Sequence, residues 1–373
     1  MRGHIRKRSK DSWTIVISLG IDPQTGKRRQ MWRSFKGITK REAEEKLTSL
    51  LNEANRGVDV NPARMTVAVL IHKWIDLHFN KLAPTTAKRY KELLNLYILP
   101  AIGAIPLKRL TALDIEEIYA QMTAKGLSAR TALQCHRVLG KALRTGVRWG
   151  AFGDKLPPQP EAPSVARYEA PALSQQSLEN IMSAAEDTDH GCLIYTALFT
   201  GLRLSELRGL RWEDLDLDEG ILSVRQTCQW LAGQGFSFRP PKSISSVRAL
   251  KLTEANVRRL KDHRNEQTTN RLSIGLYEDY DLVFASPTGA PQHPSTFRDA
   301  WKKIRSDAGV AVRFHDLRHA HASLLIRDGA HPKMISERLG HAGIQVTMDV
   351  YAHLMPGVEA EKVANLDSWL ANG

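Results

Sequence analysis

Phe314–Ile326 has the sequence FHDLRHAHASLLI, and Glu337–Leu354 has the sequence ERLGHAGIQVTMDVYAHL. These two stretches place histidines, arginines and a tyrosine among apolar residues whose spacing otherwise favours helices. A buried polar side chain that finds no partner costs about 1–3 kcal/mol of stability. The polar residues therefore either line a solvated face or converge on an anion.

The length and the charge of the chain bear on this choice. A chain of 373 residues predicts two or three domains rather than a single core. Its net charge of +13 favours a polyanionic partner, of which nucleic acid is the commonest, although many solvated surfaces are also basic.

Cysteine usage and hydropathy indicate the compartment. Cys135, Cys192 and Cys228 have no short spacing, so the sequence indicates neither a zinc cluster nor a disulfide framework. No apolar run approaches the roughly 20 residues of a membrane span. The first ten residues, MRGHIRKRSK, lack the apolar stretch of a signal peptide. We expect the protein to stay in a reducing cytoplasm.

The positive charge is concentrated at the N-terminus, where residues 1–41 hold twelve Lys or Arg against two Asp. SWTIVISLG and RRQMWRSFKGI have the composition of strands, and DPQTG has that of a turn. Thr39 and Glu42 have the spacing of a capping box before a helix that ends at Gly57. We predict a sheet-plus-helix domain over 1–57 whose cationic face reads a DNA groove; the alternative is a basic solubilising face.

The rest of the chain is predicted to be mainly helical. Residues 64–150 contain four amphipathic stretches and predict a helical bundle. Residues 151–172 contain five prolines and predict a linker. Residues 173–373 form one larger unit, with helices around QQSLENIMSAA and CLIYTALFTG and a hairpin-like stretch from GILSVRQTCQW through PKSISSVRALKL. The predicted fold class is therefore multidomain and mainly α, with small β-sheets.

Chemically versatile side chains follow one another in this last unit. Each has an ordinary structural role when taken alone, such as a surface ion pair or a polar residue at a helix entry. His315 and Arg318 are spaced i, i+3, so that on one helix they share a face. The whole set in this order is much less easily explained by chance than any one of its members. It consists of Arg203, Glu206, Lys242, His315, Arg318, His341 and Tyr351.

At these residues the sequence resembles the tyrosine recombinase, or phage integrase, family. TGLRLSELRGLRWEDLD resembles the first arginine motif of the family, and PKSISSVRALKL resembles its β-hairpin lysine segment. HDLRHAHAS resembles its His-x-x-Arg box, and LGHAGIQVTMDVYAHL resembles its segment with the last histidine and the nucleophilic tyrosine. The layout resembles integrases with an arm-type DNA-binding domain (1–57), a helical core-binding domain (64–150) and a catalytic domain (173–373).

The resemblance implies an active site that needs no metal, ATP or other cofactor. Arg203 and Arg318 would hold the non-bridging oxygens of a DNA phosphate with paired hydrogen bonds. Tyr351 would attack the phosphorus and form a 3′-phosphotyrosyl bond, with His315 accepting its proton.

Three further residues complete the implied site. His341 would donate a hydrogen bond to a phosphate oxygen. Lys242 would protonate the leaving 5′-oxygen. Glu206 would support the site without contacting DNA.

The implied function is site-specific integration and excision of a phage or other mobile element in a bacterial cytoplasm or nucleoid. Its partners would be double-stranded DNA attachment sites and three further copies of the chain on synapsed DNA, and DNA-bending accessory proteins stay open. The alternatives are a type IB topoisomerase-like enzyme that relaxes DNA and a catalytically silent DNA-binding regulator. Further DNA contacts are expected from Arg6, Lys7, Arg8, Lys27, Arg28, Arg29, Arg33, Lys88, Arg89, Arg137 and Lys141.

Overall fold

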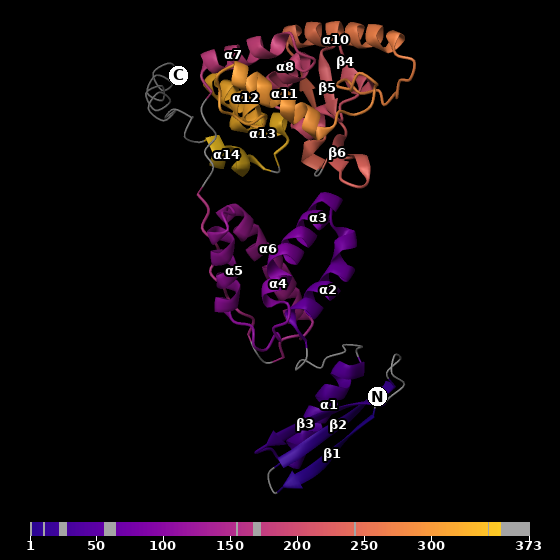
Figure 1. Cartoon of the computed structure of the whole chain (residues 1–373), viewed down its shortest axis with the longest axis vertical. Helices are drawn as coiled ribbons and strands as arrows, with labels where there is room; N and C mark the ends of the chain where they lie inside the picture. Colours follow the sequence, from indigo (N-terminus) through magenta and orange to yellow (C-terminus); the bar gives the residue numbers. More distant parts are fainter. Residues whose placement is uncertain are drawn as a thin grey trace, which may run out of the picture. The chain divides into compact units, whose positions relative to one another are not determined.

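The structure is a computed structural model that describes residues 2–9, 12–21, 28–55, 65–153, 156–166, 173–241, 244–341 and 343–351. The chain divides into two compact units, Met1–Arg167 and Tyr168–Gly373 (Figure 1). Helices predominate, and the sheets are small and antiparallel, which confirms the predicted fold class.

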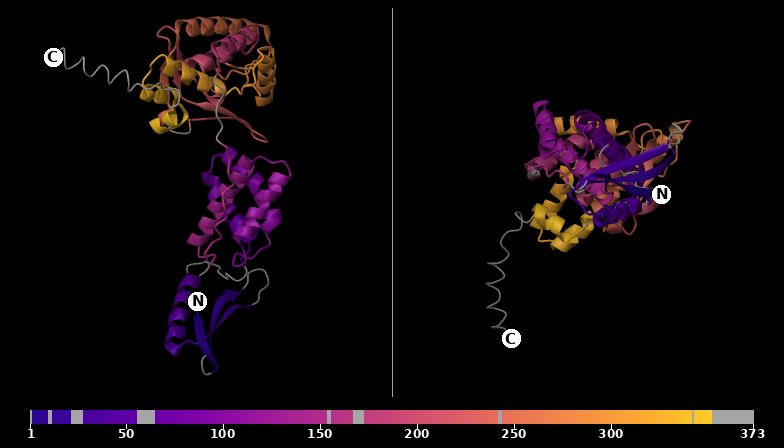
Figure 2. Two further views of the ribbon diagram at one scale, coloured as in Figure 1. Left: turned by 90° about the vertical axis from the view of Figure 1, so that its left-hand side faces the viewer. Right: turned by 90° about the horizontal axis from the view of Figure 1, so that it is seen from below.

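The first unit begins with a three-stranded sheet and one helix. The strands β1 (Arg2–Ser9), β2 (Ser12–Ile21) and β3 (Arg28–Lys36) lie in that order. α1 (Lys40–Asn55) packs on one face of this sheet, with Leu47 against Ile15 and Ile17 (Figures 1 and 2). The sequence pattern does not predict β1, because RGHIRKRS has basic residues where strands usually have β-branched ones.

Two capping boxes start helices, and the sequence predicts the first of them. The backbone N–H of Thr39 donates to Glu42 Oε2 at 2.7 Å, at the start of α1. The backbone N–H of Thr111 donates to Asp114 Oδ2 at 2.8 Å. Each pair satisfies backbone donors that a helix start would otherwise leave without partners.

A helical bundle with its own core makes up the rest of the first unit. Its core contains Leu70, Ile98 and Leu139, all buried. The regular α-helix that begins at Pro84 stops at Leu93, where the chain widens into a π-turn at Leu94–Ile98 just before Pro100. A proline has no N–H to donate and cannot continue a regular helix. The helices are α2 (Val67–His78), α3 (Pro84–Leu93), α4 (Leu99–Ile102), α5 (Ala112–Ala124) and α6 (Ala129–Arg148).

The second unit surrounds a larger core to which Ile194, Leu198, Phe297 and Leu317 contribute. Its helices are α7 (Gln175–Glu186), α8 (Gly191–Thr200), α9 (Leu204–Leu207), α10 (Glu254–Ser273), α11 (Pro294–Asp307), α12 (Asp316–Arg327), α13 (Pro332–Leu339) and α14 (Ile344–Tyr351). Its strands are β4 (Leu215–Asp216), β5 (Ile221–Val224), β6 (Thr227–Leu231), β7 (Gly235–Arg239) and β8 (Arg248–Lys251).

These strands form two sheets where the sequence predicts one hairpin-like stretch. β5 pairs with β8 in the sheet β4-β5-β8, and β6 pairs with β7 in a separate hairpin between them. The pairing of β5 with β8 spans the whole inserted hairpin. Local sequence patterns predict strands, but they do not determine which distant strand is the partner.

Two left-handed glycines end the helices that lead into the candidate site. Gly201 ends α8 with φ 66°, and Gly340 ends α13 with φ 64°. A Cβ at Gly340 would come within 2.9 Å of Nη1 of Arg248. Glycine is therefore required there both for the backbone conformation and for the close approach of the arginine.

Candidate active site

The ends of α8 and α13 bring four of the predicted catalytic residues together. Arg203 is the N-cap of α9, His315 precedes α12, Arg318 lies in the first turn of α12, and His341 follows Gly340. Nη2 of Arg203 donates to the carbonyl oxygen of Gly340 at 3.2 Å. This bond joins segments that are 137 residues apart in the sequence.

Arg203 is held by Glu206 from one helical turn away. Its backbone N–H donates to Oε2 of Glu206 at 2.9 Å, and its Nη1 donates to Oε1 at 2.7 Å. The Glu206 side chain is only 2% exposed. Burial raises the pKa of Glu206, but the charges and hydrogen bonds of Arg248 and Arg203 outweigh burial, so the pKa is lowered and the carboxylate stays ionised.

Arg318 is held by backbone carbonyls at the ends of both helices. Its Nη1 donates to the carbonyl oxygen of Gly201 at 2.7 Å, and its Nη2 donates to that of Leu339. The residue is only 4% exposed. The ends of α8 and α13 therefore fix the plane of this guanidinium.

His341 and His315 are neutral near pH 7. Burial, followed by repulsion from Arg318, lowers the pKa of His341 to about 4. Its Nδ1 lies 2.8 Å from Oγ1 of the buried Thr347. Burial among neighbouring groups, followed by repulsion from His319 and Arg318, lowers the pKa of His315 to about 4, although part of His315 stays exposed to solvent. A neutral imidazole has one nitrogen that accepts a proton.

His321 is buried on α12, where it packs rather than facing solvent. Its Nε2 accepts a hydrogen bond from Nε of Arg338 at 3.0 Å. Because the arginine only donates, the bonded nitrogen must carry a lone pair. Burial, followed by repulsion from Arg338, lowers the pKa of His321 to about 3.

We expect His321 to make the folded chain sensitive to acid. Because its pKa is lower in the folded state, the unfolded chain binds more protons between about pH 6.5 and 3, and stability falls as the pH falls. At pH 5 this group should cost about 2 kcal/mol relative to pH 7.5. Chemical denaturation at both pH values should show that the free energy of unfolding falls less for His321→Gln than for wild type. The amide oxygen of this glutamine can still accept from Arg338. Equal losses for the two proteins would contradict this role.

Of the two other predicted catalytic residues, the structure describes only the backbone of Tyr351. Tyr351 is the last residue of α14, and its side chain lies outside the described part. Lys242 lies outside the described residues; the short 3₁₀-helix Ile244–Ser246 and then β8 follow it. The catalytic roles of both stay predictions.

The sheet of the first unit carries several of the residues predicted to contact DNA. Arg6 opposes Thr14, and Trp32 opposes Val16, on the face that α1 does not cover. Trp32 is 54% exposed, and the Arg6 guanidinium lies 5.8 Å from its ring centre. This face combines cations with an aromatic ring. Three of the other predicted DNA-contact residues of this domain are described: Arg8 is exposed, Lys7 lies over the Trp13 ring, and Arg33 is partly buried. The remaining three are not, because Lys27 lies outside the described residues and the side chains of Arg28 and Arg29 are not described.

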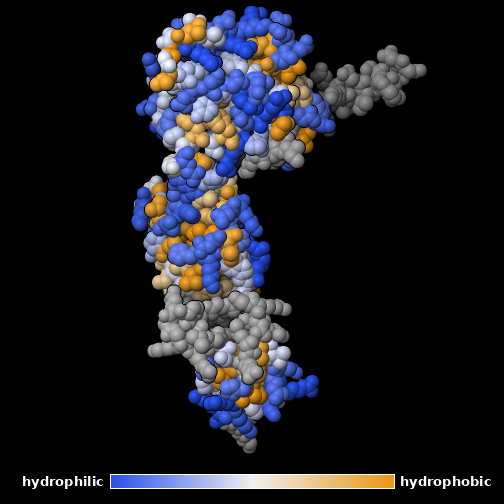
Figure 3. All heavy atoms as spheres, turned by 90° about the vertical axis from the view of Figure 1, so that its right-hand side faces the viewer, coloured by the Kyte–Doolittle hydropathy of each residue, from blue (hydrophilic) through white to orange (hydrophobic). Residues whose placement is uncertain are grey.

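The bundle brings the other predicted DNA-contact residues together on α3 and α6. Nε of Arg89 donates to Oε1 of Gln134 at 3.1 Å, and Nζ of Lys141 donates to the hydroxyl of Tyr90 at 2.8 Å. Lys88, Arg89, Arg137 and Lys141 are all exposed. On the face seen in Figure 3, the surface of the bundle mixes hydrophobic and hydrophilic residues.

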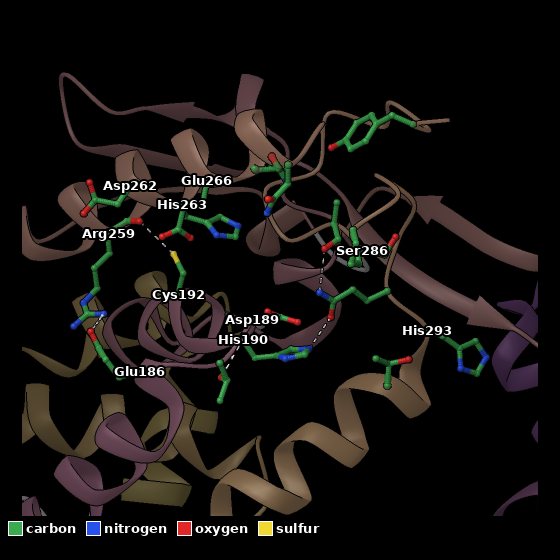
Figure 4. A pocket seen from close by; sticks show the side chains of 18 residues that line it. Glu186, Asp189, His190, Cys192, Arg259, Asp262, His263, Glu266, Ser286 and His293 are labelled. Carbon is green, nitrogen blue, oxygen red and sulfur yellow. Dashed lines mark hydrogen bonds and ion pairs between the residues drawn. The ribbon is translucent and has the colours of Figure 1, made fainter. Parts of the chain in front are cut away.

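A pocket of about 430 Å³ in the second unit contains none of the six predicted catalytic residues (Figure 4). It is lined by residues of α10 and of the loops around His190 and Ser286, and Glu186 pairs with Arg259 at its edge. Asp189, Asp262 and Glu266 also line it, so its acidic character disfavours a phosphate. Within the described ranges, no group of three or more His, Cys, Asp or Glu could hold a metal ion, and no helix is long and apolar enough to cross a membrane.

Sequence reasoning missed Arg248, the first residue of β8. Its Nη2 donates to Oε2 of Glu206 at 3.0 Å, so it contacts the carboxylate that holds Arg203. The available signal was an arginine that follows Lys242 by six residues inside PKSISSVRALKL.

Comparison with known protein families divides the chain into three matched segments. Residues 171–357 match the model described as the phage integrase family. Residues 66–122 match the N-terminal SAM-like domain of phage integrases, and residues 4–54 match an arm DNA-binding domain.

Individual relatives agree with these matches. An integrase of Streptomyces ambofaciens is 30% identical over 92% of this chain and 89% of its own. A tyrosine recombinase XerC-like protein of Caldanaerobacter subterraneus subsp. tengcongensis is 27% identical over 97% of both chains. A solved structure of the Tn1549 transposon integrase with transposon right end DNA has a TM-score of 0.68 and 23% identity, and the match covers 80% of this chain and 100% of that one.

Proposed function

The chain belongs to the phage integrase family, and we propose that six of its residues carry the chemistry by which it breaks and rejoins DNA. The protein is a site-specific tyrosine recombinase, an integrase of a mobile element. The six residues are Arg203, Lys242, His315, Arg318, His341 and Tyr351.

Cleavage begins when the phenol oxygen of Tyr351 attacks the scissile phosphorus. The phenol proton passes to His315, because a phenol with a pKa near 10 is a weak nucleophile until it loses that proton. The bond from phosphorus to the 5′-oxygen breaks, and Lys242 gives that oxygen a proton. The 3′-phosphate then stays on Tyr351, and a 5′-hydroxyl from the partner strand can attack it in the reverse sequence of steps.

The phosphate is stabilised by groups that are already in place. As the nucleophile attacks, negative charge gathers on the non-bridging oxygens, which Arg203 and Arg318 can bind with paired donors. His341 donates a further hydrogen bond. The negative charge of the phosphate also offsets the repulsion among the cations, so we expect the pKa of His315 and His341 to rise when DNA binds.

One observation carries this proposal. Arg203 and Arg318 come from different helices, and both donate to carbonyls at the C-terminal end of α13, directly before His341. Such fixed donors need little reorganisation when charge develops on a phosphate.

The remaining parts serve DNA recognition and assembly. We propose an arm-binding domain over 1–57, a core-binding domain over 64–150, a linker over 151–172 and a catalytic domain over 173–373. The basic residues of the first two domains contact the DNA backbone, which positions the protein on its attachment sites. A solved structure of lambda integrase is a tetramer on a Holliday junction, has a TM-score of 0.56 and is 17% identical to this chain. We propose that this chain also acts as four copies, in the cytoplasm where chromosomal DNA lies.

Exchange of DNA partners is the result that tests this function. Wild-type protein given two differently labelled duplexes with attachment sites should yield duplexes joined in a new combination. A topoisomerase would reseal each duplex with its own strands. Covalent adduct and DNA relaxation without any exchanged product would contradict recombination, and their complete absence would favour the silent regulator.

A further inference from the structure

Arg248 occupies the centre of a buried network at the candidate active site. Its side chain is 7% exposed. Nη1 and Nη2 donate to the two carboxylate oxygens of Glu206 at 3.3 and 3.0 Å. Its Nε donates to the carbonyl oxygen of Arg338 at 2.6 Å, and Nη1 also donates to that of Ser246 at 3.0 Å.

The end of α13 receives arginines from three different segments. Arg248 of β8 donates to the carbonyl oxygen of Arg338, Arg318 of α12 to that of Leu339, and Arg203 of α9 to that of Gly340. The last carbonyls of a helix have no hydrogen-bond partner within the helix, and they carry the partial negative charge at the C-terminal end of its dipole. Three successive carbonyls therefore fix three guanidiniums at one point.

Arg248 differs from the other two arginines in what it joins. Its bonds connect the helix of the phosphate-binding Arg203, through Glu206, with the turn that leads to His341 and α14. Its bond to Ser246 reaches the segment that follows Lys242. Arg248 donates to both carboxylate oxygens of Glu206, and its other acceptors are backbone carbonyl oxygens.

We infer that Arg248 is a positioning residue for strand cleavage: it holds Glu206, and through Glu206 the guanidinium of Arg203, in register with the α13–α14 turn. This inference rests on the proposed function. Without Arg248, the buried Glu206 keeps Arg203 as its cationic partner and competes with the DNA phosphate for the donors of Arg203. A misplacement of about 1 Å at a reacting centre can cost on the order of 100-fold in rate.

The loss of Arg248 should also leave a signature in the pH profile. Burial raises the pKa of Glu206, and Arg248 is the largest influence that opposes burial. In Arg248→Gln the positive charge beside the Glu206 carboxylate is removed. The pKa of Glu206 therefore rises, and the carboxylate takes up a proton at a higher pH. The pH below which Glu206 becomes protonated should therefore lie higher in this variant than in wild type, and the pH profile of its cleavage rate should differ from that of wild type.

The test measures covalent adduct formation by the full chain on a nicked suicide duplex that carries the cleavage site mapped with the wild-type protein. We expect Arg248→Gln to slow the adduct step about 100-fold with DNA affinity unchanged within about twofold. Arg248→Lys keeps the positive charge but not the paired geometry. It should lose about tenfold in rate and keep the wild-type pH profile. Arg259→Gln is the matched control, because it breaks the Arg259–Glu186 pair, at 2.8 Å, in the same unit without touching this network.

A second measurement needs neither DNA nor activity. Hydrogen exchange of the free chain should be faster in Arg248→Gln at residues 203–207 and 336–341, with the amides of α10 unchanged. Unchanged exchange at both segments, or an adduct rate equal to that of Arg259→Gln, would overturn the inference. Faster exchange at these segments in a chain whose wild type forms no adduct would uphold the network and reject the proposed function instead.

Discussion

Tyr351→Phe is expected to abolish the covalent adduct while DNA binding stays unchanged. The substitution removes only the phenol oxygen, the atom that attacks phosphorus in the proposed mechanism. Loss of a nucleophile typically costs about 10⁴-fold or more in rate. Adduct trapped on a suicide duplex can be measured by denaturing gel electrophoresis, with the gel shift of the same duplex reporting binding.

A matched tyrosine variant separates this role from a general effect on the fold. Tyr280 lies in the same unit, is exposed and stacks with Phe238 at a centroid distance of 5.8 Å. Tyr280→Phe should form adduct at the wild-type rate. Adduct formed by Tyr351→Phe, or lost equally in both variants, would contradict the assignment of the nucleophile.

The second large effect is expected for Lys242→Ala. Without a general acid the 5′-oxygen must leave as an alkoxide, and general-acid catalysis is worth about 10²–10⁴-fold. A duplex with sulfur at the 5′-bridging position should restore the rate, because a thiolate leaves without needing a proton. Cleavage rates on the oxygen and sulfur duplexes give the measurement.

Lys251→Ala supplies the control for this experiment. Lys251 ends β8 in the same part of the chain, and its exposed side chain bonds to the carbonyl oxygen of Glu219. We expect the Lys251→Ala variant to cleave both duplexes at the wild-type rate. A Lys242→Ala variant that stays slow on the sulfur duplex would place the general acid at another residue.

The features of the fold that local chemistry determines were predictable from the sequence. Thr39 with Glu42 starts α1, as the spacing predicts, since a capping box involves residues three apart. Gly201 ends α8 in the left-handed conformation for a similarly local reason. The order of the catalytic motifs also lies in the sequence, and the structure brings Arg203, His315, Arg318 and His341 to one place.

What escaped prediction depends on partners that are distant in the sequence. β8 pairs with β5 across an inserted hairpin, and Arg248 meets Glu206 from 42 residues away. His321 is buried, and Arg338 donates a hydrogen bond to it from α13. Neither spacing nor composition encodes such meetings, because they arise only when separate segments pack together.

The central claim is that Tyr351 becomes covalently joined to the 3′-phosphate of a cleaved DNA strand. Wild-type protein can be trapped on a nicked suicide duplex, digested with protease and nuclease, and analysed by mass spectrometry. The account predicts one modified peptide, with a nucleotide 3′-phosphate on Tyr351 and a free 5′-hydroxyl on the released strand. A nucleotide attached to any other residue, or a phosphate left on the 5′ end, would contradict it.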